Sequence, residues 1–493
     1  MKNVNAFLQA NDRLMPVQTN APASVGQRKN SGPKEVHLLF ITGIILGVLY
    51  SSTGLNIKEC LVISLQVYSF IRFINNFGNT ICFYDFLCLT SVLTTLTLPL
   101  VGYRIFNASN SLAYLWKAYM FVPEDVYYDF VIPSNIALLL GANALLGRFT
   151  NQYYLQLFEK LRITGKGKAK AGIVLTLLGF VASFFATSGH SAAFIIYLFS
   201  MLKYVGPIYI YFSGMRNRMV FFIGSLVMFF LQALANGMFG EFLMYSALTM
   251  MLFSLRFKWR FFSKLLFSLL GFSLVVLIQM TKPVYRQITW RSKTIEGLSA
   301  VNNSNFEIFS TLFINRISSP SKIFVEEPLF RVYTRLNQGW LIARAMNYVP
   351  RVEPYADGET MIRTFLGIIV PRVLWPDKPE AGGYENLSRF VGIKRKLKYS
   401  MDIGPYGEAY GNFGPVAGVG FIFFYGLLLS YFLKMLLVKC FKTPSLLIWA
   451  PLLFYYTLMV ETDIFNTVNF VVKTAIFVWF IFWVAKTFFK TSL

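Results

Sequence analysis

The chain has 493 residues, of which 55% are hydrophobic and only 14% charged, and its formal net charge is +23 at pH 7. Apolar stretches of about twenty residues recur along most of its length, and a helix of that size crosses the ~30 Å hydrocarbon layer of a bilayer. Lys and Arg fall in the gaps between these stretches without forming a basic arm, which disfavours a nucleic-acid-binding protein and is typical of topology signals and anionic lipid contact. We therefore expect an all-α polytopic membrane protein, with membrane lipid and no nucleic acid among its partners.

The first 35 residues are polar and include Pro16, Pro22 and Pro33. They lack the short apolar core and small-residue cleavage site of a secretory signal, so we expect the first membrane helix to direct insertion. The four cysteines are scattered through or beside apolar stretches without the close pairing of a metal site, and we assign them no chemistry.

Twelve stretches have the length and apolarity of membrane helices. A long polar gap follows the ninth, which divides the chain into a polar N-terminus (1–35), a first membrane region (36–281), a loop domain (282–411) and a second membrane region (412–493). The expected helices lie at 36–53, 59–75, 80–103, 127–147, 171–188, 191–212, 219–236, 240–256, 261–280, 412–434, 445–460 and 468–488.

The charges between these helices predict the orientation of the chain. Basic residues concentrate in the gaps at 148–170, 216–218, 256–264 and 439–442, which all fall on one side of a twelve-helix arrangement. Because basic residues resist translocation, that side is the cytoplasm, and both termini lie there. The 282–411 loop then lies on the outer face.

This outer loop holds more Lys and Arg than Asp and Glu. A translocated basic segment indicates an anionic ligand, with ordinary solvated surface charge as the alternative. Residues 326–348 have helical spacing that places Arg331, Arg335 and Gln338 on one face, and residues 360–370 form a second amphipathic piece that could lie in the membrane interface.

The arginines of the loop are candidates for binding phosphate. A planar guanidinium grips a phosphate through paired hydrogen bonds and stays charged in a site of low dielectric. Arg335 and Arg372 are candidate catalytic residues that neutralise charge on a leaving diphosphate, and Arg331 and Arg344 are candidate substrate-binding residues.

Residues 371–379 read PRVLWPDKP and combine two rigid prolines with an aromatic ring and an ion pair. Trp375 is suited to stacking on a sugar ring, Asp377 to orienting hydroxyls, and Lys378 to binding charge. The alternative is a rigid interfacial turn that Trp375 anchors, and a turn of that kind can also hold a site.

Residues 407–414 read GEAYGNFG and lie at the outer mouth of the tenth expected helix. Glycines allow a ligand to approach the backbone closely, which makes Tyr410 and Asn412 candidate substrate-binding residues. Glu408 is a candidate general base, because a partly desolvated carboxylate has a raised pKa. The alternative for Glu408 is a helix cap or an ion pair with an arginine.

Two further polar residues carry weaker signals. His190 lies on a short outer turn, and a lone histidine is poor evidence for a site. Asp85 lies inside an apolar stretch, where a carboxylate is costly unless it has a partner, and Arg72 on the neighbouring helix is the expected one. We expect that pair to be structural.

The motifs at 371–379 and 407–414, and more loosely FVPED at 121–125 followed by VIP at 131–133, resemble the O-antigen polymerase (Wzy-type) family of oligosaccharide repeat-unit polymerases. The sharp similarity covers about 60 residues, and the helix count and large loop agree with it. The resemblance implies a multi-pass protein of the bacterial inner membrane whose large loop is periplasmic.

The resemblance also implies a glycosyltransferase that uses no nucleotide sugar and no cofactor. A growing glycan would move from its undecaprenyl diphosphate onto the non-reducing sugar of a new lipid-linked repeat unit, and a polysaccharide chain-length regulator is a further expected partner. The 282–411 loop contains no Asp-x-Asp metal signature, which agrees with a metal-independent reaction.

Two other functions remain open at this point. The related O-antigen ligase passes the glycan to a lipid A core and shares the topology. A flippase for lipid-linked oligosaccharide also needs many helices and basic residues, but it keeps its charges inside the bundle and has short loops.

Overall fold

The computed structural model describes residues 35–185, 193–295, 297–319, 325–370, 374–375, 383–393, 401–490 and 493. Within these ranges the regular elements are helices, and the only β pairing consists of the isolated bridges Phe77–Thr80 and Ile295–Leu298. The predicted all-helical class is confirmed for this part of the chain.

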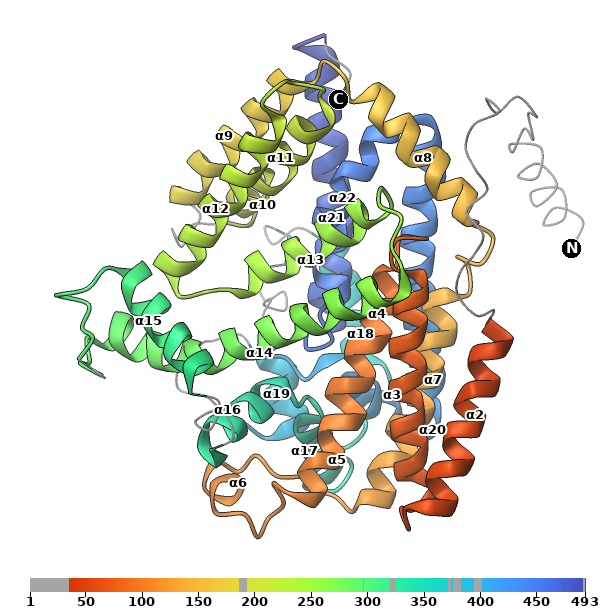
Figure 1. The fold of residues 1–493 in the computed structure, drawn as a ribbon. Coiled ribbons are helices and arrows are strands. Elements are labelled where there is room, and N and C mark those ends of the chain that lie inside the picture. Colours follow the sequence, from red (N-terminus) through yellow and green to blue (C-terminus); the bar gives the residue numbers. More distant parts are fainter. Residues whose placement is uncertain are drawn as a thin grey trace, which may run out of the picture.

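The largest helix contact joins α7 (Glu124–Asn143) to α20 (Gly404–Lys442), which lie side by side in Figure 1. Small residues allow this approach, because a Cβ on Gly141 would lie 2.2 Å from a backbone oxygen of α20, and one on Gly426 would lie 2.8 Å from a backbone nitrogen of α7. These two helices form the centre of one half of the molecule.

The other half is built on α9 (Ala169–Phe185) and α11 (Leu202–Phe212). Gly172 and Gly206 bring their backbones together, since a Cβ on Gly206 would meet the Gly172 carbonyl oxygen at 2.5 Å. The helix α12 (Arg218–Asn236) packs against α11 in the same half (Figure 1).

The other helices connect and surround these two halves. Those before the 282–411 segment are α2 (Glu35–Ser52), α3 (Ile57–Asn76), α4 (Phe83–Val92), η1 (Leu93–Thr97, a π-helix), α5 (Leu98–Arg104), α6 (Ser111–Trp116), α8 (Asn151–Thr164), α10 (Ala193–Ser200), α13 (Gly240–Ser254) and α14 (Phe261–Arg291). Those within and after it are α15 (Asn305–Ser318), α16 (Glu326–Leu336), α17 (Gly339–Tyr348), α18 (Glu359–Ile369), α19 (Tyr384–Val391), η3 (Pro444–Trp449, 3-10), α21 (Ala450–Leu453), η4 (Tyr456–Leu458, 3-10) and α22 (Ile464–Thr487).

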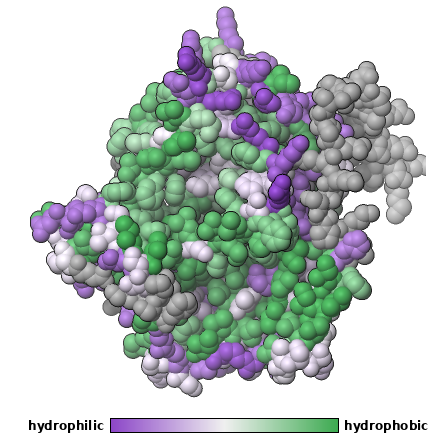
Figure 2. Space-filling view, in the orientation of Figure 1, coloured by the Kyte–Doolittle hydropathy of each residue, from purple (hydrophilic) through white to green (hydrophobic). Residues whose placement is uncertain are grey.

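Six helices in the described ranges are long and apolar enough to cross a membrane. A seventh span results if α8 and α9, which meet at 93°, are counted as one broken span. Figure 2 shows hydrophobic residues across the middle of the visible face and hydrophilic ones at the top of the view, at the α15 end and along the lower edge. These features are compatible with a multi-pass membrane protein. The six candidates are Phe83–Arg104, Phe194–Phe212, Arg218–Asn236, Phe261–Arg291, Gly404–Lys442 and Ile464–Thr487.

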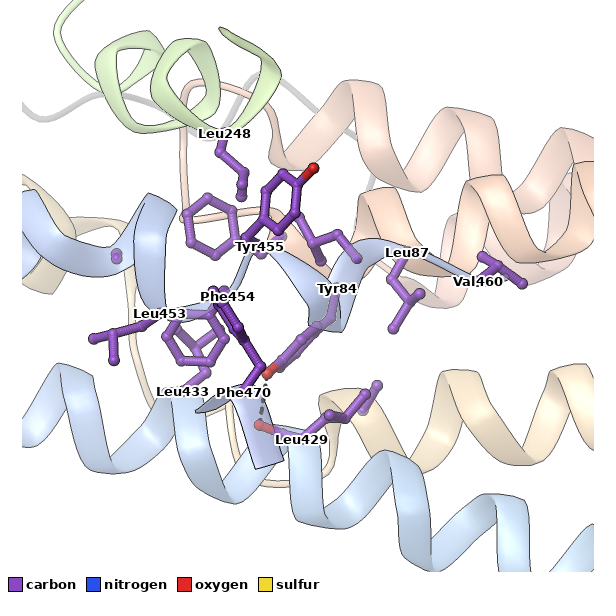
Figure 3. Close-up of a cluster of buried hydrophobic side chains, with 14 of the residues drawn as sticks. Tyr84, Leu87, Leu248, Leu429, Leu433, Leu453, Phe454, Tyr455, Val460 and Phe470 are labelled. Atoms are coloured by element: carbon purple, nitrogen blue, oxygen red, sulfur yellow. Dashed lines mark hydrogen bonds between the residues drawn. The ribbon is translucent and has the colours of Figure 1, made fainter. Parts of the chain in front are cut away.

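The stretch at 445–460, expected as one helix, is divided into η3, α21 and η4. Pro444 and Pro451 lie at the starts of η3 and α21, where a missing N–H costs least, and neither proline can continue a preceding helix. Downstream residues then pack into the core. Tyr455, Phe454 and Val460 lie in a buried cluster with side chains of α4, α13, α20 and α22 (Figure 3).

The expected pairing of Asp85 with Arg72 is present, with Nε of Arg72 2.7 Å from Oδ1 of Asp85. Asn76 donates a second hydrogen bond to the same carboxylate, at 2.9 Å. The pair ties α3 to α4, which agrees with the structural role expected for it.

The 282–411 segment is largely helical where it is described, and α16, α17 and α19 gather below α14 in Figure 1. The tenth expected helix begins earlier than predicted, at Gly404, and is broken at Gly414, where φ is 70° and ψ is −169°. Only glycine adopts such a conformation readily, and Pro415 follows it. The short helical piece before the break carries Glu408, Tyr410 and Asn412.

Candidate functional site

The turn between η4 and α22 carries two carboxylates in different surroundings. Glu461 and Asp463 are two residues apart, so their Cα atoms lie within about 7 Å of each other. The buried cluster of Figure 3 includes Val460 and so fixes the chain just before the turn. The neighbours of each carboxylate define one part of the candidate site.

Three carboxylates converge on the first turn of α22. Asp463 is the N-cap, and its Oδ1 accepts a hydrogen bond from the Asn466 backbone N–H at 2.7 Å. Asp402 Oδ2 accepts from the Asp463 N–H at 3.3 Å, and Glu408 Oε2 accepts from the Ile464 N–H at 3.0 Å. The start of a helix leaves four N–H groups without intrahelical partners and carries a partial positive charge, so it holds these anions in place.

Two asparagine side chains complete this carboxylate cluster. Asn386 of α19 donates to Glu408 Oε1, and Asn466 donates to Asp402 Oδ2 at 3.2 Å. Burial raises the pKa of Asp402 from 3.8 to about 6. Burial, together with the negative charges of Glu408 and Asp402, raises the pKa of Asp463 well above its ordinary value. The cluster can therefore take up a proton near neutral pH, as a general base must.

A small cavity of about 60 Å³ lies between α18, α19 and the start of α22. Of the carboxylate cluster, Asp463 and Asn386 line this cavity, while Asp402 and Glu408 do not. The hydroxyls of two threonines, two guanidinium groups and the carboxylate of Glu385 make up most of the remaining wall. The lining residues are Thr360, Arg363, Thr364, Gly383, Glu385, Asn386, Arg389, Asp463 and Phe465.

The two arginines of this cavity differ in their partners. Arg389 donates to Glu353 at 2.8 Å and to Glu359 at 3.0 Å, so its charge is balanced within the protein. Arg363 makes no ion pair or hydrogen bond with any residue that the structure describes. Among the described residues, Arg363 is therefore the arginine of this cavity whose charge has no partner.

Glu461 faces the other way, toward α16 and α17. Arg335 Nη2 lies 3.2 Å from Glu461 Oε1, and Gln338 Nε2 donates to Oε2 at 3.4 Å. The side chains of Arg335 and Glu461 are 56% and 42% exposed, so a ligand can reach both. In this structure Glu461 supplies the anion that Arg335 binds.

A second cavity, of about 290 Å³, lies among α11, α12, α13 and α14. Lys203, Lys282 and Arg286 line it, against the single carboxylate of Glu241. The lining residues are Lys203, Tyr204, Phe229, Gln232, Ala233, Asn236, Met238, Gly240, Glu241, Phe242, Lys282 and Arg286.

The basic residues of the second cavity include one without a counterion. Lys203 donates to Ser183 at 3.2 Å and to Gln232 at 3.0 Å, and Arg286 donates to a backbone carbonyl and stacks on Trp290 at 4.1 Å. Lys282 has no hydrogen bond or ion pair within the described part of the chain.

The charges of Arg286 and Arg335 both act on Lys282, and so does the opposite charge of Glu461. We call Lys282, Arg286 and Arg335 the cation cluster. A cluster with this excess of positive charge suits an anion with several oxygens, such as a diphosphate.

The three predicted arginines that the structure describes, Arg331, Arg335 and Arg344, line neither cavity, and only Arg335 contacts the acidic turn. Arg331 pairs with Glu327 at 2.7 Å, one turn away on α16. Arg344 donates to the Val391 carbonyl at 3.2 Å and lies over the ring of Phe121 at 5.2 Å. Their predicted role in binding substrate stays a prediction.

Some residues of the two motifs make contacts inside the protein, and others lie outside the described ranges. Asn412 exchanges hydrogen bonds with Thr360 at 2.7 and 2.9 Å and so locks α18 onto α20, while Tyr410 packs against Phe130 and Tyr355. Trp375 is half-buried. Arg372, Asp377 and Lys378 lie outside the described residues, as does His190.

The sequence interpretation missed several residues of both cavities. Glu461 and Asp463 lie in an outer gap that contains no Lys or Arg. The absence of basic residues there indicated the topology and did not indicate a site. Lys203, Lys282 and Arg286 lie in or beside apolar stretches, and a basic residue there is a signal for function that could have singled them out.

Within the described ranges, no group of three or more His, Cys, Asp or Glu side chains has the geometry of a metal site. The expectation of metal-independent chemistry stays untested. Comparison of the chain with protein-family models, with curated proteins and with solved structures finds no match.

Proposed function

We propose that this chain is a polysaccharide polymerase of the O-antigen (Wzy) type, which joins undecaprenyl-diphosphate-linked oligosaccharide repeat units at the periplasmic face of the bacterial inner membrane. The proposal continues the resemblance at residues 371–379 and 407–414. The observation that carries it is the turn at Glu461 and Asp463, where Glu461 pairs with Arg335 of the cation cluster and Asp463 lines the cavity of about 60 Å³.

The cation cluster supplies the donor site in this proposal. When the anomeric carbon of the growing glycan leaves its lipid diphosphate, negative charge builds up on the departing phosphate oxygens. Lys282 has no ion pair with any residue that the structure describes, and Arg335 can exchange the Glu461 carboxylate for a phosphate, so both would stabilise that charge most strongly as the bond breaks. Arg331, Arg344 and Arg372 remain proposed contacts along the same substrate.

The carboxylate cluster supplies the acceptor site. Transfer requires a hydroxyl of the acceptor sugar to lose its proton as it attacks the anomeric carbon. One carboxylate of the cluster is the proposed base, and Glu408 of the 407–414 motif is the one that the sequence predicts. Thr360 and Asn386 of the cavity wall offer hydrogen bonds to sugar hydroxyls. Trp375, Asp377, Lys378, Tyr410 and Asn412 are retained as proposed sugar-binding residues.

The proposal includes an arrangement in the membrane. We infer that residues 282–411 lie on the periplasmic side and that both termini lie in the cytoplasm, because the basic gaps at 148–170 and 256–264 resist translocation. The count of twelve membrane helices and the binding of a chain-length regulator belong to this proposal as well.

One observation favours a transporter as the second candidate. The cavity with Lys203, Lys282 and Arg286 is lined by α11, α12 and α14, which belong to candidate membrane spans, together with the shorter α13. Intramembrane charge that faces a cavity marks the substrate pathway of a transporter. A flippase would use this cavity to carry the diphosphate across the bilayer rather than to stabilise it as a leaving group.

Purified protein in detergent, supplied with synthetic undecaprenyl-diphosphate-linked repeat units, tests the proposal. We expect wild type to give a ladder of polymer on a gel, and Lys282→Ala to form polymer at least 30-fold more slowly. Lys293→Ala is the control, because Lys293 is an exposed lysine eleven residues further along the chain. A flippase would give no polymer from either protein. A ligase would consume the units only when a lipid A core is added.

A further inference from the structure

Of the three carboxylates at the start of α22, only Asp463 faces the cavity between α18 and α19. Asp463 lines that cavity, whereas both oxygens of Glu408 are engaged behind it, one by Asn386 and one by the Ile464 N–H. Both residues are buried, so what distinguishes them is that Asp463 lines the cavity and Glu408 does not. A substrate hydroxyl in the cavity would therefore meet Asp463 and not Glu408.

The carboxylate of Asp463 keeps one oxygen available for a ligand. Its Oδ1 accepts from the Asn466 N–H at 2.7 Å, and its Oδ2 makes no hydrogen bond with any described residue. The N-cap geometry fixes the side chain, so the carboxylate that lines the cavity is held in one orientation. An oriented oxygen with free lone pairs is what proton abstraction from a hydroxyl requires.

The cavity wall suits a sugar hydroxyl. Thr360, Thr364 and Asn386 offer hydroxyl and amide groups, and Arg363 offers a guanidinium that no described residue binds. The cavity, of about 60 Å³, is much smaller than the second cavity of about 290 Å³, so we expect it to admit the hydroxyl-bearing edge of a sugar rather than the whole ring. The rest of the acceptor would lie outside the cavity.

We propose that Asp463 is the general base of the transfer and that Asp402 and Glu408 are positioning residues that act through it, an inference that rests on the proposed polymerase function. Asp463 takes the proton of the acceptor hydroxyl as its oxygen bonds to the anomeric carbon of the donor glycan. The bond between that carbon and the diphosphate breaks, and its electron pair leaves with undecaprenyl diphosphate. Asp463 then releases the proton to water.

The groups around Asp463 come from every element packed on it. Asp402 lies before α20 and Glu408 on α20. The other charged groups of the cavity are Arg363 on α18 and Glu385 and Arg389 on α19, and Arg389 is already paired to two glutamates. Burial and the two nearby carboxylates, Glu408 and Asp402, favour the protonated form of Asp463, and the hydrogen bond from the Asn466 N–H opposes them. Removing the charge of Asp402 should therefore shift the acidic limb of the rate profile to lower pH.

The test uses the full-length protein in detergent and measures polymer formation from synthetic lipid-linked repeat units as a function of pH. Asp463→Asn and Asp463→Ser both retain a good N-cap side chain for α22, so they remove the base while keeping the helix start. We expect each to slow turnover at least 100-fold with the KM for the lipid-linked unit within 3-fold of wild type. Asp357→Asn, the same chemical change at an exposed position, is the control.

The positioning residues give a different pattern. Asp402→Asn should keep turnover within about 10-fold of wild type and move the acidic limb by at least half a pH unit, which a purely structural residue would not do. Glu408→Gln should lose less turnover than Asp463→Asn.

The failures of the two proposals are distinguishable. If Asp463→Asn and Asp463→Ser polymerise within 3-fold of wild type, or Glu408→Gln alone abolishes turnover, Asp463 is not the base although the polymerase function stands. If wild type itself makes no polymer, the proposed function fails, and with it this inference.

Discussion

The contribution of the positive charge of Arg335 to activity can be measured separately from that of its planar guanidinium group. Arg335 holds Glu461 through one terminal nitrogen, which leaves other donors of the guanidinium for a phosphate. Lysine keeps the charge but loses the planar fork, so Arg335→Lys should lower kcat/KM for lipid-linked repeat units by at least 30-fold, or about 2 kcal/mol of transition-state stabilisation.

Arg316→Lys provides the matched control for that measurement, because Arg316 lies on α15, away from the residues that line either cavity. Equal activity of Arg335→Lys and wild type would mean that Arg335 contributes charge alone or does not contact the diphosphate.

At Gly383 the backbone lies very close to the Asp402 carboxylate of the site. Its φ is +66°, and an added Cβ would lie 2.2 Å from Asp402 Oδ1. Gly383→Ala should therefore lower the free energy of unfolding by more than the ~1 kcal/mol expected of alanine in such a conformation alone, and it should reduce polymer formation because Asp402 must shift.

Gly297→Ala separates the two effects, because Gly297 has φ of +76° with no atom near an added Cβ. Thermal unfolding and polymer assays on both variants make the comparison. A Gly383→Ala protein no less stable and no less active than Gly297→Ala would contradict the close packing of Asp402.

At the scale of elements, the attachment of α22 to α20 depends on pH through Asp402. Burial raises the pKa of Asp402 from 3.8 to about 6 in the folded protein, so the folded state holds more protons than the unfolded state between about pH 4 and pH 6. The contribution of Asp402 to the free energy of unfolding is therefore highest below pH 4 and falls by about 3 kcal/mol as the pH rises to 6.

Thermal unfolding of wild type and Asp402→Asn from pH 4 to pH 7 checks this expectation. The stability difference between the two proteins should move in favour of Asp402→Asn as the pH rises, since asparagine carries no charge to bury. A difference that is constant over this range would show that Asp402 has an ordinary pKa.

The elements also explain how far the sequence could predict this site. Apolar runs of membrane length mark the helices, because a buried or lipid-facing helix must be apolar along its length. Glycines in the 407–414 motif marked the region of Glu408, where Gly414 does break the helix. The acidic turn was not recognised as a site because Asp402 meets the Asp463 N–H across 61 residues of sequence, a contact that only the packing of α20 on α22 creates.

The second cavity was missed for a related reason. Lys203 and Lys282 come from different helices and are 79 residues apart, so neither shows in the sequence that it faces the same space. Local spacing found Arg335 and Gln338, which are near in sequence and do share Glu461. The local sequence pattern therefore predicts which side chains come together within one helical region. Which side chains from distant helices come together depends on how the helices pack.

At the scale of the whole molecule, both proposals require the turn at Glu461 and Asp463 to lie on the periplasmic side, together with the 282–411 segment. Cysteine labelling can establish this, because Cys60, Cys82, Cys88 and Cys440 are all buried and should react little. Asn302, before α15, and Lys166, after α8, are exposed positions that the topology places on opposite sides of the membrane.

We expect Asn302→Cys to react with a membrane-impermeant maleimide in intact spheroplasts, and Lys166→Cys to react only after the membrane is permeabilised. The physical reason is that the 148–170 gap is rich in Lys and Arg and resists translocation, whereas long loops translocate despite their charge. The reverse pattern would place the cation cluster and Asp463 in the cytoplasm, where nucleotide sugars are present. The position of the site would then no longer indicate a donor carried on a lipid diphosphate. Only the two motifs at 371–379 and 407–414 would still support a polymerase.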